Sequence, residues 1–129
     1  MVAREWRILC RMTHPLDDYE KVDKPWGSYE FFMLNEPCSV KFLHLLPGKR
    51  LSLQRHAHRE EFWRIARGSG IATIDGKEIE MKEDDELLIK VGTVHRFTGG
   101  PEGATILEIT IGTHDEADIE RLEDDFGRK

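Results

Sequence analysis

The sequence predicts an all-β domain, and three observations indicate this fold class. Short segments rich in β-branched and aromatic residues follow one another along most of the chain. Turn signals containing Gly, Pro, Asp and Asn separate these segments at close spacing. Before residue 115 the apolar residues do not recur with the helical period. A series of short strands of this kind is typical of a barrel or a sandwich.

The expected strands can be justified from their own residues. Residues 50–56 alternate cleanly between leucine and polar side chains, and residues 77–82 set two apolar residues against charged neighbours. Asp75-Gly76, between two strands, is a two-residue hairpin signal. Residues 98–103 are rich in Gly and Pro and predict a loop. The expected strands are 28–33, 40–46, 50–56, 61–67, 70–74, 77–82, 87–91, 94–97 and 104–112.

The two ends of the chain differ from this series. Residues 1–23 predict an N-terminal leader or arm, and residues 24–129 predict one domain. The last part of that domain predicts a short C-terminal helix, because Asp115 is a suitable N-cap and three apolar residues follow on one helical stripe. These apolar residues are Ile119, Leu122 and Phe126.

Composition and charge exclude several classes of protein. The length of 129 residues and the hydrophobic content of 39% suit one domain with one core. A net charge of −6 argues against a general nucleic-acid binder, although a local cluster of cations could still bind an anionic substrate. No apolar run approaches the roughly 20 residues of a membrane span. Two cysteines without a CxxC spacing, and no signal-peptide pattern, favour a reducing, cytoplasmic location.

Residues 47–68 concentrate side chains that bind metals. Residues two apart in an extended strand share a face, so several of these side chains would project together. They are Gln54, His56, His58, Glu60 and Glu61. Imidazole and carboxylate groups are ligands of divalent metals, and this segment predicts half of a metal site. His95, three residues after Gly92, is the candidate for the other half.

The spacing of these residues resembles the two motifs of the cupin superfamily. The glycine, the two histidine positions, the glutamate and the closing glycine of the first motif fall on Gly48, Gln54, His56, Glu61 and Gly68. Glutamine therefore stands at the first histidine position. Gly92 and His95 match the glycine and histidine of the second motif. The chain departs from that motif at turn positions, where Asp84, Lys90 and Gly99 replace Gly, Pro and Asn.

Longer segments are similar to the type II phosphomannose isomerase family. They are PWGSYE (25–30), LSLQRHAHREEFW (51–63) and DIERLEDDFGR (118–128). In that family the cupin occurs alone or as the C-terminal part of a bifunctional mannose-6-phosphate isomerase/mannose-1-phosphate guanylyltransferase. Nothing here resembles the guanylyltransferase part. The resemblance implies a single cupin barrel (a double-stranded β-helix, or jelly roll), a homodimer, and a metal-dependent isomerase that interconverts mannose 6-phosphate and fructose 6-phosphate.

Two ligand sets for the implied metal remain open. One comprises Gln54, His56, Glu61 and His95, and the motif spacing favours it. The other replaces Gln54 with His58, and ligand softness favours it because imidazole binds zinc better than a carboxamide does. Zinc is the expected metal, with Mn, Co, Ni and Fe as alternatives.

The implied reaction also needs a proton-transfer group and a site for the sugar phosphate. His58 is the first candidate for acid–base catalysis and Glu60 the second. Arginine suits phosphate because it forms bidentate hydrogen bonds. The candidate substrate-binding cations are Lys24, Arg50, Arg59, Arg96 and Arg128. The alternatives from other classes are a non-catalytic sugar-binding cupin and a different metal-dependent cupin enzyme such as a dioxygenase.

Overall fold

The computed structural model describes residues 14–129, and these residues form β-strands and connecting loops without a helix. None of them therefore forms a helix long and apolar enough to cross a membrane. The chain divides into two compact units, Met1–Pro37 and Cys38–Lys129.

The first unit contains an antiparallel hairpin of β1 (Glu20–Lys24) and β2 (Gly27–Phe31). Pro25 and Trp26 form its turn, and Gly27 follows with a φ of 140°. The strand β1 was not predicted, because its charged residues show no apolar alternation. The hairpin spans the boundary that was predicted between residues 23 and 24.

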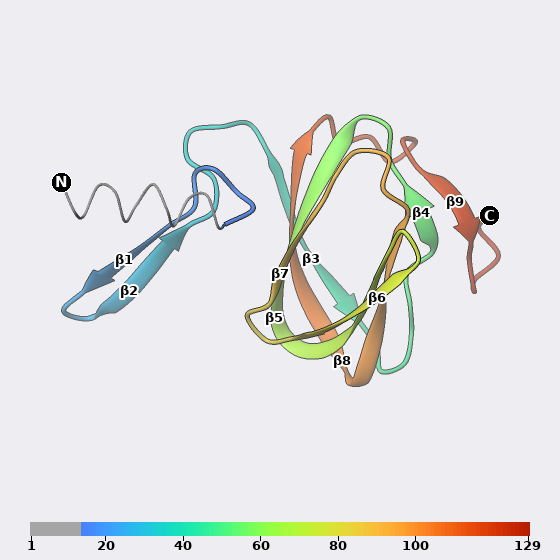
Figure 1. The fold of residues 1–129 in the computed structure, drawn as a ribbon, viewed down its shortest axis with the longest axis horizontal. Helices are drawn as coiled ribbons and strands as arrows, with labels where there is room; N and C mark the ends of the chain where they lie inside the picture. Colours follow the sequence, from blue (N-terminus) through green and yellow to red (C-terminus); the bar gives the residue numbers. More distant parts are fainter. Residues whose placement is uncertain (1–13) are drawn as a thin grey trace. The chain divides into compact units, whose positions relative to one another are not determined.

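The second unit is a curled seven-stranded sheet that closes into a barrel (Figure 1). Its strands are β3 (Ser39–Leu45), β4 (Leu53–Arg55), β5 (Arg59–Ile74), β6 (Lys77–Lys82), β7 (Glu86–Ile89), β8 (His95–Gly112) and β9 (Glu120–Glu123). The order along the sheet is β6-β5-β8-β4-β9, and β3 and β7 pair with β8 and β5 respectively. Every pair is antiparallel. This architecture confirms the all-β prediction.

The long strands β5 and β8 form the frame of the barrel. They pair from Arg59↔Gly112 at one end to Ile74↔His95 at the other, with register shifts near Gly68. The predicted loop at residues 98–103 is wrong, because β8 runs through it. Glycine makes this possible: a Cβ on Gly68 would lie 2.2 Å from the carbonyl oxygen of Gly103. The glycines that suggested a loop instead allow two backbones to approach closely.

The turn between β5 and β6 is the predicted one. Asp75 and Gly76 join Ile74 to its partner Lys77, and both turn residues have positive φ, 47° and 84°. Positive φ at both central residues defines the type I′ turn, whose twist matches that of the flanking strands. The hairpin prediction is confirmed.

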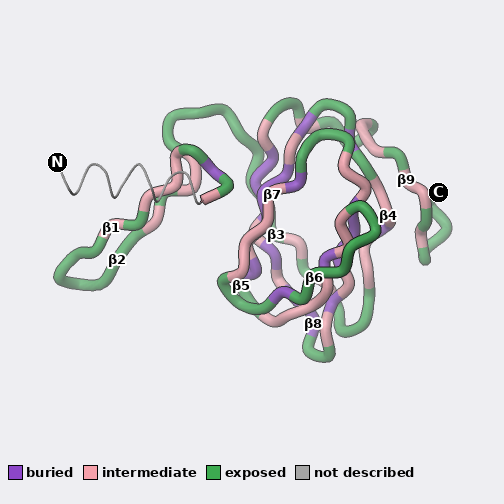
Figure 2. Tube along the Cα trace, in the orientation of Figure 1, coloured by how far each residue is buried: buried purple, intermediate pink, exposed green. Residues whose placement is uncertain are grey.

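The core of the barrel lies mainly along β5 and β8, where the buried residues gather in Figure 2. It consists of Trp63, Ile65, Ala72, Met81, Ile89, Phe97, Ala104 and Ile106. Residues two apart in a strand share a face, so the same inward faces also carry the polar residues that follow.

The predicted C-terminal helix is wrong, because the tail contains the strand β9 instead. β9 pairs antiparallel with β4, and Arg121 lies opposite Gln54. Arg55 of β4 forms an ion pair with Glu120 of β9 at 2.7 Å. The edge of β4 offers main-chain hydrogen bonds from residues distant in sequence, which a local helical pattern cannot reveal.

Candidate metal centre

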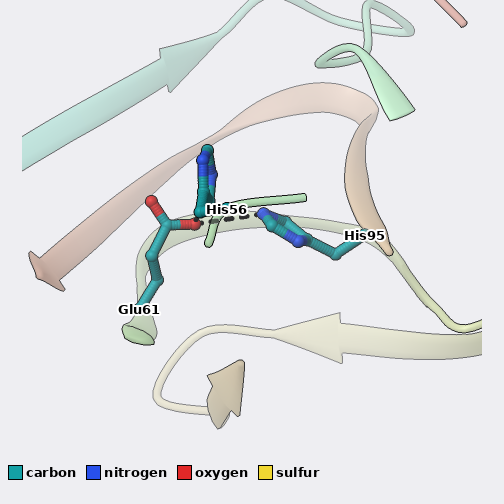
Figure 3. A group of neighbouring side chains, drawn as sticks. All are labelled: His56, Glu61 and His95. Atoms are coloured by element: carbon teal, nitrogen blue, oxygen red, sulfur yellow. Dashed lines mark hydrogen bonds and ion pairs between the residues drawn. The ribbon is translucent and has the colours of Figure 1, made fainter. Parts of the chain in front are cut away.

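Three strands bring one glutamate and two histidines together inside the barrel. His56 follows β4, Glu61 is in β5, and His95 is the first residue of β8. Figure 3 shows both imidazole rings directed at the Glu61 carboxylate. Oε1 of Glu61 lies 3.0 Å from Nε2 of His95 and 3.5 Å from Nε2 of His56. All three residues are buried.

Main-chain carbonyl groups fix the orientation of both rings. Nδ1 of His56 donates to the carbonyl oxygen of Asp118 at 2.6 Å, and Nδ1 of His95 donates to that of Thr93 at 2.8 Å. A neutral imidazole carries one proton, so these bonds leave Nε2 unprotonated on each neutral ring. Nε2 is the atom that faces Glu61 in both cases.

The cluster collects electron-rich atoms that need a cation. Burial alone would raise the pKa of Glu61, but hydrogen bonds from His56 and His95, which donate through Nε2 when their rings are protonated, outweigh burial and hold this pKa well below its usual range. For His56, burial lowers the pKa, while the bonds to Glu61 and Asp118 raise it above its usual value. Two imidazole nitrogens and a carboxylate oxygen face one another, and either protons or a metal ion can balance them.

The residues present fit a divalent metal ion. The two Nε2 atoms and a carboxylate oxygen lie within 4.8 Å of one another. Tetrahedral ligands at about 2.0–2.2 Å from one zinc ion lie roughly 3.3–3.6 Å apart, which is close to the 3.0 and 3.5 Å that separate the two Nε2 atoms from Oε1 of Glu61. Nitrogen and oxygen ligands of this kind suit zinc, iron, manganese, cobalt or nickel. Histidines that bind metals through Nε2 typically donate their Nδ1 proton to a carbonyl or carboxylate.

Gln54 is adjacent to this cluster. Its Nε2 lies 3.1 Å from Nε2 of His56, and its Oε1 accepts a hydrogen bond from the Ser52 hydroxyl at 2.5 Å. A half-turn of the amide would direct the oxygen at the cluster. The buried Ser52 hydroxyl could then accept from the amide nitrogen, because a hydroxyl both donates and accepts. Gln54 is thus placed to serve as a fourth ligand.

Arg59 adds a buried positive charge beside the cluster. Its Nε donates to Oε2 of Glu61 at 3.3 Å, and a terminal nitrogen lies 3.3 Å from Nε2 of His56. The other terminal nitrogen donates to the carbonyl oxygen of Asp115 at 3.1 Å. The guanidinium group is 5% exposed. It places a fixed positive charge beside the cluster.

A known protein family matches most of the chain. The family described as "Mannose-6-phosphate isomerase C-terminal" matches residues 12–124. The chain belongs to this family. The resemblance seen in the sequence is thereby confirmed.

Curated relatives of this chain are much longer proteins. The alginate biosynthesis protein AlgA of Pseudomonas aeruginosa is 39% identical over 110 residues, which are 84% of this chain and 23% of AlgA. The mannose-1-phosphate guanylyltransferase ManC of Salmonella typhimurium is 32% identical over 124 residues, which are 95% of this chain and 26% of ManC. The chain therefore spans about a quarter of the length of these relatives.

Solved structures share the fold of the domain. A cupin protein from Bacteroides fragilis matches with a TM-score of 0.55 and 20% identity, covering 76% of this chain and 87% of that one. ChmJ, a 3'-monoepimerase from Streptomyces bikiniensis solved with dTDP-quinovose, matches with a TM-score of 0.65 and 9% identity, covering 81% and 66%. At these identities the likeness concerns the cupin fold alone.

The two predicted acid–base residues of this family member lie outside the cluster. His58 is exposed, and its main-chain N–H donates to the Asp118 carboxylate. Glu60 is half-buried and pairs with Lys90 at 3.4 Å. Because β5 begins at Arg59, the side chains of residues 59 and 61 share the inward face, and Glu60 projects from the other face.

The predicted phosphate-binding cations are dispersed. Arg59 joins the cluster, whereas Arg50, Arg96 and Arg128 pair with the tail carboxylates of Asp125, Glu123 and Asp124 respectively. Lys24 belongs to the first unit, where its Nζ lies 6.0 Å from the centre of the Tyr29 ring.

A second buried carboxylate, that of Glu108, was not predicted from the sequence. Glu108 accepts a hydrogen bond from Nε1 of Trp63 at 2.9 Å and lies 3.5 Å from Nζ of Lys41. Burial raises the pKa of Glu108, and the negative charge of Glu61 adds to this effect. The available signal was its inward position in the alternating segment 104–112, where the other inward residues are apolar or small.

Proposed function

We propose that this chain is a metal-dependent aldose–ketose isomerase that interconverts mannose 6-phosphate and fructose 6-phosphate. The convergence of Nε2 of His56, Nε2 of His95 and the Glu61 carboxylate carries the proposal. Family membership supports the choice of a phosphorylated hexose as substrate. Isomerisation moves a proton between C1 and C2 of the open-chain sugar, through an enediol with negative charge on oxygen.

His56, Glu61, His95 and Gln54 would hold the metal ion. When bound, such an ion acts as a Lewis acid that polarises the sugar carbonyl and stabilises negative charge on its oxygen. The chain's own contribution is to present these ligands in a buried setting, where electrostatic interactions are stronger than in water. We propose zinc as the metal.

Arg59 has a second electrostatic role in this proposal. Its guanidinium group is held between Glu61 and the carbonyl of Asp115, so it needs no reorganisation when charge develops. A sugar oxygen that approaches the cluster from the side of His56 would meet this cation. Arg59 is one of the five cations that the sequence offers for the phosphate, and its position beside Glu61 favours the reacting oxygens instead.

His58 is the proposed proton-transfer group. Its exposed imidazole can meet a sugar that enters from solvent, and the bond from its main-chain N–H to Asp118 fixes the backbone at this point. An imidazole can both accept the C1 or C2 proton and return it, as an isomerase requires.

A coupled isomerase assay with metal-loaded protein tests the proposal. We expect the zinc-loaded chain to convert mannose 6-phosphate to fructose 6-phosphate, and a chelator to stop the reaction reversibly. His95→Ala should lose both metal and activity. His44→Ala is the matched control, because His44 bonds to Thr105 on β3 and β8 away from the cluster. It should retain both.

The same assay separates the alternative function. A chain that binds one metal ion and turns over neither sugar phosphate would contradict the isomerase and favour a sugar-binding cupin. A His95→Ala variant that keeps its metal would instead contradict the ligand assignment.

A further inference from the structure

Asp118 contacts three successive residues of the loop that carries His56. Its main-chain carbonyl accepts from Nδ1 of His56 at 2.6 Å. Its carboxylate accepts from the main-chain N–H of Ala57 at 2.8 Å and from that of His58 at 2.9 Å. One residue of the tail thus binds the whole turn between β4 and β5.

The tail that carries Asp118 is itself fixed to the barrel. Strand β9 pairs with β4, and Arg55 pairs with Glu120 at 2.7 Å. Figure 1 shows β9 lying along β4. Further along the tail, Asp125 accepts two hydrogen bonds from Arg50, at 2.6 and 2.8 Å. These contacts fix the position of the Asp118 carbonyl relative to the barrel.

The two histidines of the cluster differ in how they are held. His95 donates to the carbonyl of Thr93, two residues away in its own segment. His56 donates to a carbonyl 62 residues further along the chain. The direction of His95 is a local property of its turn, whereas the direction of His56 depends on the tail.

We infer that Asp118 is a positioning residue of the metal centre. Its carboxylate clamps the main chain of residues 57 and 58, which keeps its carbonyl on Nδ1 of His56 and leaves Nε2 as the metal-facing atom. Loss of such outer partners typically weakens metal affinity about 10- to 100-fold. The inference rests on the metal centre within the proposed function, and it does not depend on which sugar is the substrate.

Zinc affinity of the full chain, measured by competition with a chromophoric chelator, is the first test. Asp118→Ala removes both acceptors of the clamp, and we expect zinc affinity to fall about 10- to 100-fold. Asp118→Asn keeps one acceptor and loses the other, so we expect a smaller loss. The matched control is Asp124→Ala in the same tail, whose carboxylate bonds to Arg128. It should bind zinc as the wild type does.

The tautomer of His56 is the second test. A general loss of stability would not change the tautomer of His56 while leaving that of His95 unchanged. Long-range ¹H–¹⁵N spectra of the metal-free protein, at a pH where both rings are neutral, should show the proton on Nδ1 of His56 and His95. In the Asp118 variants His56 should become a mixture of tautomers and His95 should not change. If Asp118→Ala does not fold, Asp118→Asn carries both measurements.

Several outcomes would overturn the inference. Wild-type zinc affinity in a folded Asp118 variant would do so, and so would an unchanged His56 tautomer. An equal loss of affinity in Asp124→Ala would show that the tail acts only through its general attachment. Wild-type protein that binds zinc but does not isomerise sugar phosphates would contradict the proposed function while leaving the role of Asp118 intact.

Discussion

His56 and His95 face Glu61 with the same ring nitrogen, because a main-chain carbonyl holds the other nitrogen of each ring. This arrangement selects one tautomer before any ligand arrives. The two rings hold the pKa of Glu61 below its usual range, and Nε of Arg59 donates to its other carboxylate oxygen. The cluster is therefore prepared, at the level of single atoms, to bind a cation.

Replacement of His58 separates catalysis from metal binding. We expect His58→Gln to keep its zinc and to lower kcat about 100-fold or more, because glutamine cannot relay a proton. Metal content and the coupled assay check this result. A variant with normal kcat would remove His58 from the mechanism, and loss of zinc would support the ligand set that includes His58.

At the residue scale, the spacing of the motifs predicted which side chains meet. Whether each neighbouring side chain points into or out of the barrel depends on its place in the alternation of the strand. The segment from His56 to Glu61 and the distant His95 could be predicted as one cluster from their spacing. The inward direction of Arg59 could not, because it depends on the residue at which β5 begins. The clamp by Asp118 needs the path of the tail, which no local pattern contains.

At the scale of elements, β5 and β8 hold the site through close backbone contact. Gly68 has a φ of 78° and faces the carbonyl of Gly103, and Gly70 faces that of Thr98. A Cβ on either glycine would lie 2.2 Å from the opposing oxygen. These contacts allow both strands to continue through their register shifts and to bend around the core.

Substitution at Gly68 should therefore be costly. Gly68→Ala introduces a side chain in a left-handed conformation and against a backbone oxygen, so we expect a loss of about 3 kcal/mol or more in unfolding free energy. Gly76→Ala is the matched control, with a φ of 84° and no atom within 4 Å of the added Cβ. It should cost about 1–2 kcal/mol. Urea unfolding measures both, and equal losses would contradict the role of close approach.

The ion pair between Arg50 and Asp125 should make the attachment of the tail dependent on pH. The hydrogen bond from Arg50 holds the pKa of Asp125 below its usual range. The pair therefore contributes stability above the pKa of the unfolded state and loses it as the pH falls through the lower pKa of the folded state.

Comparison of wild type with Asp125→Asn checks this sign. Their unfolding midpoints should differ at neutral pH and converge in acid, and Arg50→Gln should behave in the same way. Because both side chains are well exposed, we expect a small difference. A difference that persists in acid would show that Asp125 acts through something other than its charge.

The tail also shows the limit of sequence patterns at this scale. Ile119, Leu122 and Phe126 have helical spacing, yet Phe126 is 57% exposed and β9 is extended. Main-chain pairing with β4 and ion pairs to the barrel outweigh that pattern. The expected strands before the tail were mostly correct, because alternation reflects a face that must be buried.

At the scale of the whole molecule, β3 is one of the edge strands of the barrel. It pairs with β8 on one side. Its outward face carries Val40 and Phe42, and Leu46 follows, with exposed fractions of 60%, 57% and 68%. An edge of this kind favours pairing with another chain unless something covers it. The homodimer that the family resemblance implies would provide such a cover.

Light scattering after size-exclusion chromatography tests this expectation. We expect the wild type to be a dimer and Phe42→Ser to dissociate at about 10-fold higher concentration or more. Val91→Ser is the control, because Val91 is 51% exposed and lies outside β3. A wild-type monomer at all concentrations would contradict the dimer, and equal effects of both variants would contradict the role of β3.

The pairing of β5 with β8 also has a kinetic consequence. Barrel closure joins Arg59 to Gly112 and Ile74 to His95, which are distant in sequence, so we expect the rate-limiting step of folding to include closing long loops. We expect His56 and His95 to meet only when the barrel closes, because His56 follows β4 and His95 begins β8, two strands that pair with each other. A metal ion bound at that stage would leave the folding rate almost unchanged and would slow unfolding. The centre would therefore increase the kinetic stability of the folded barrel.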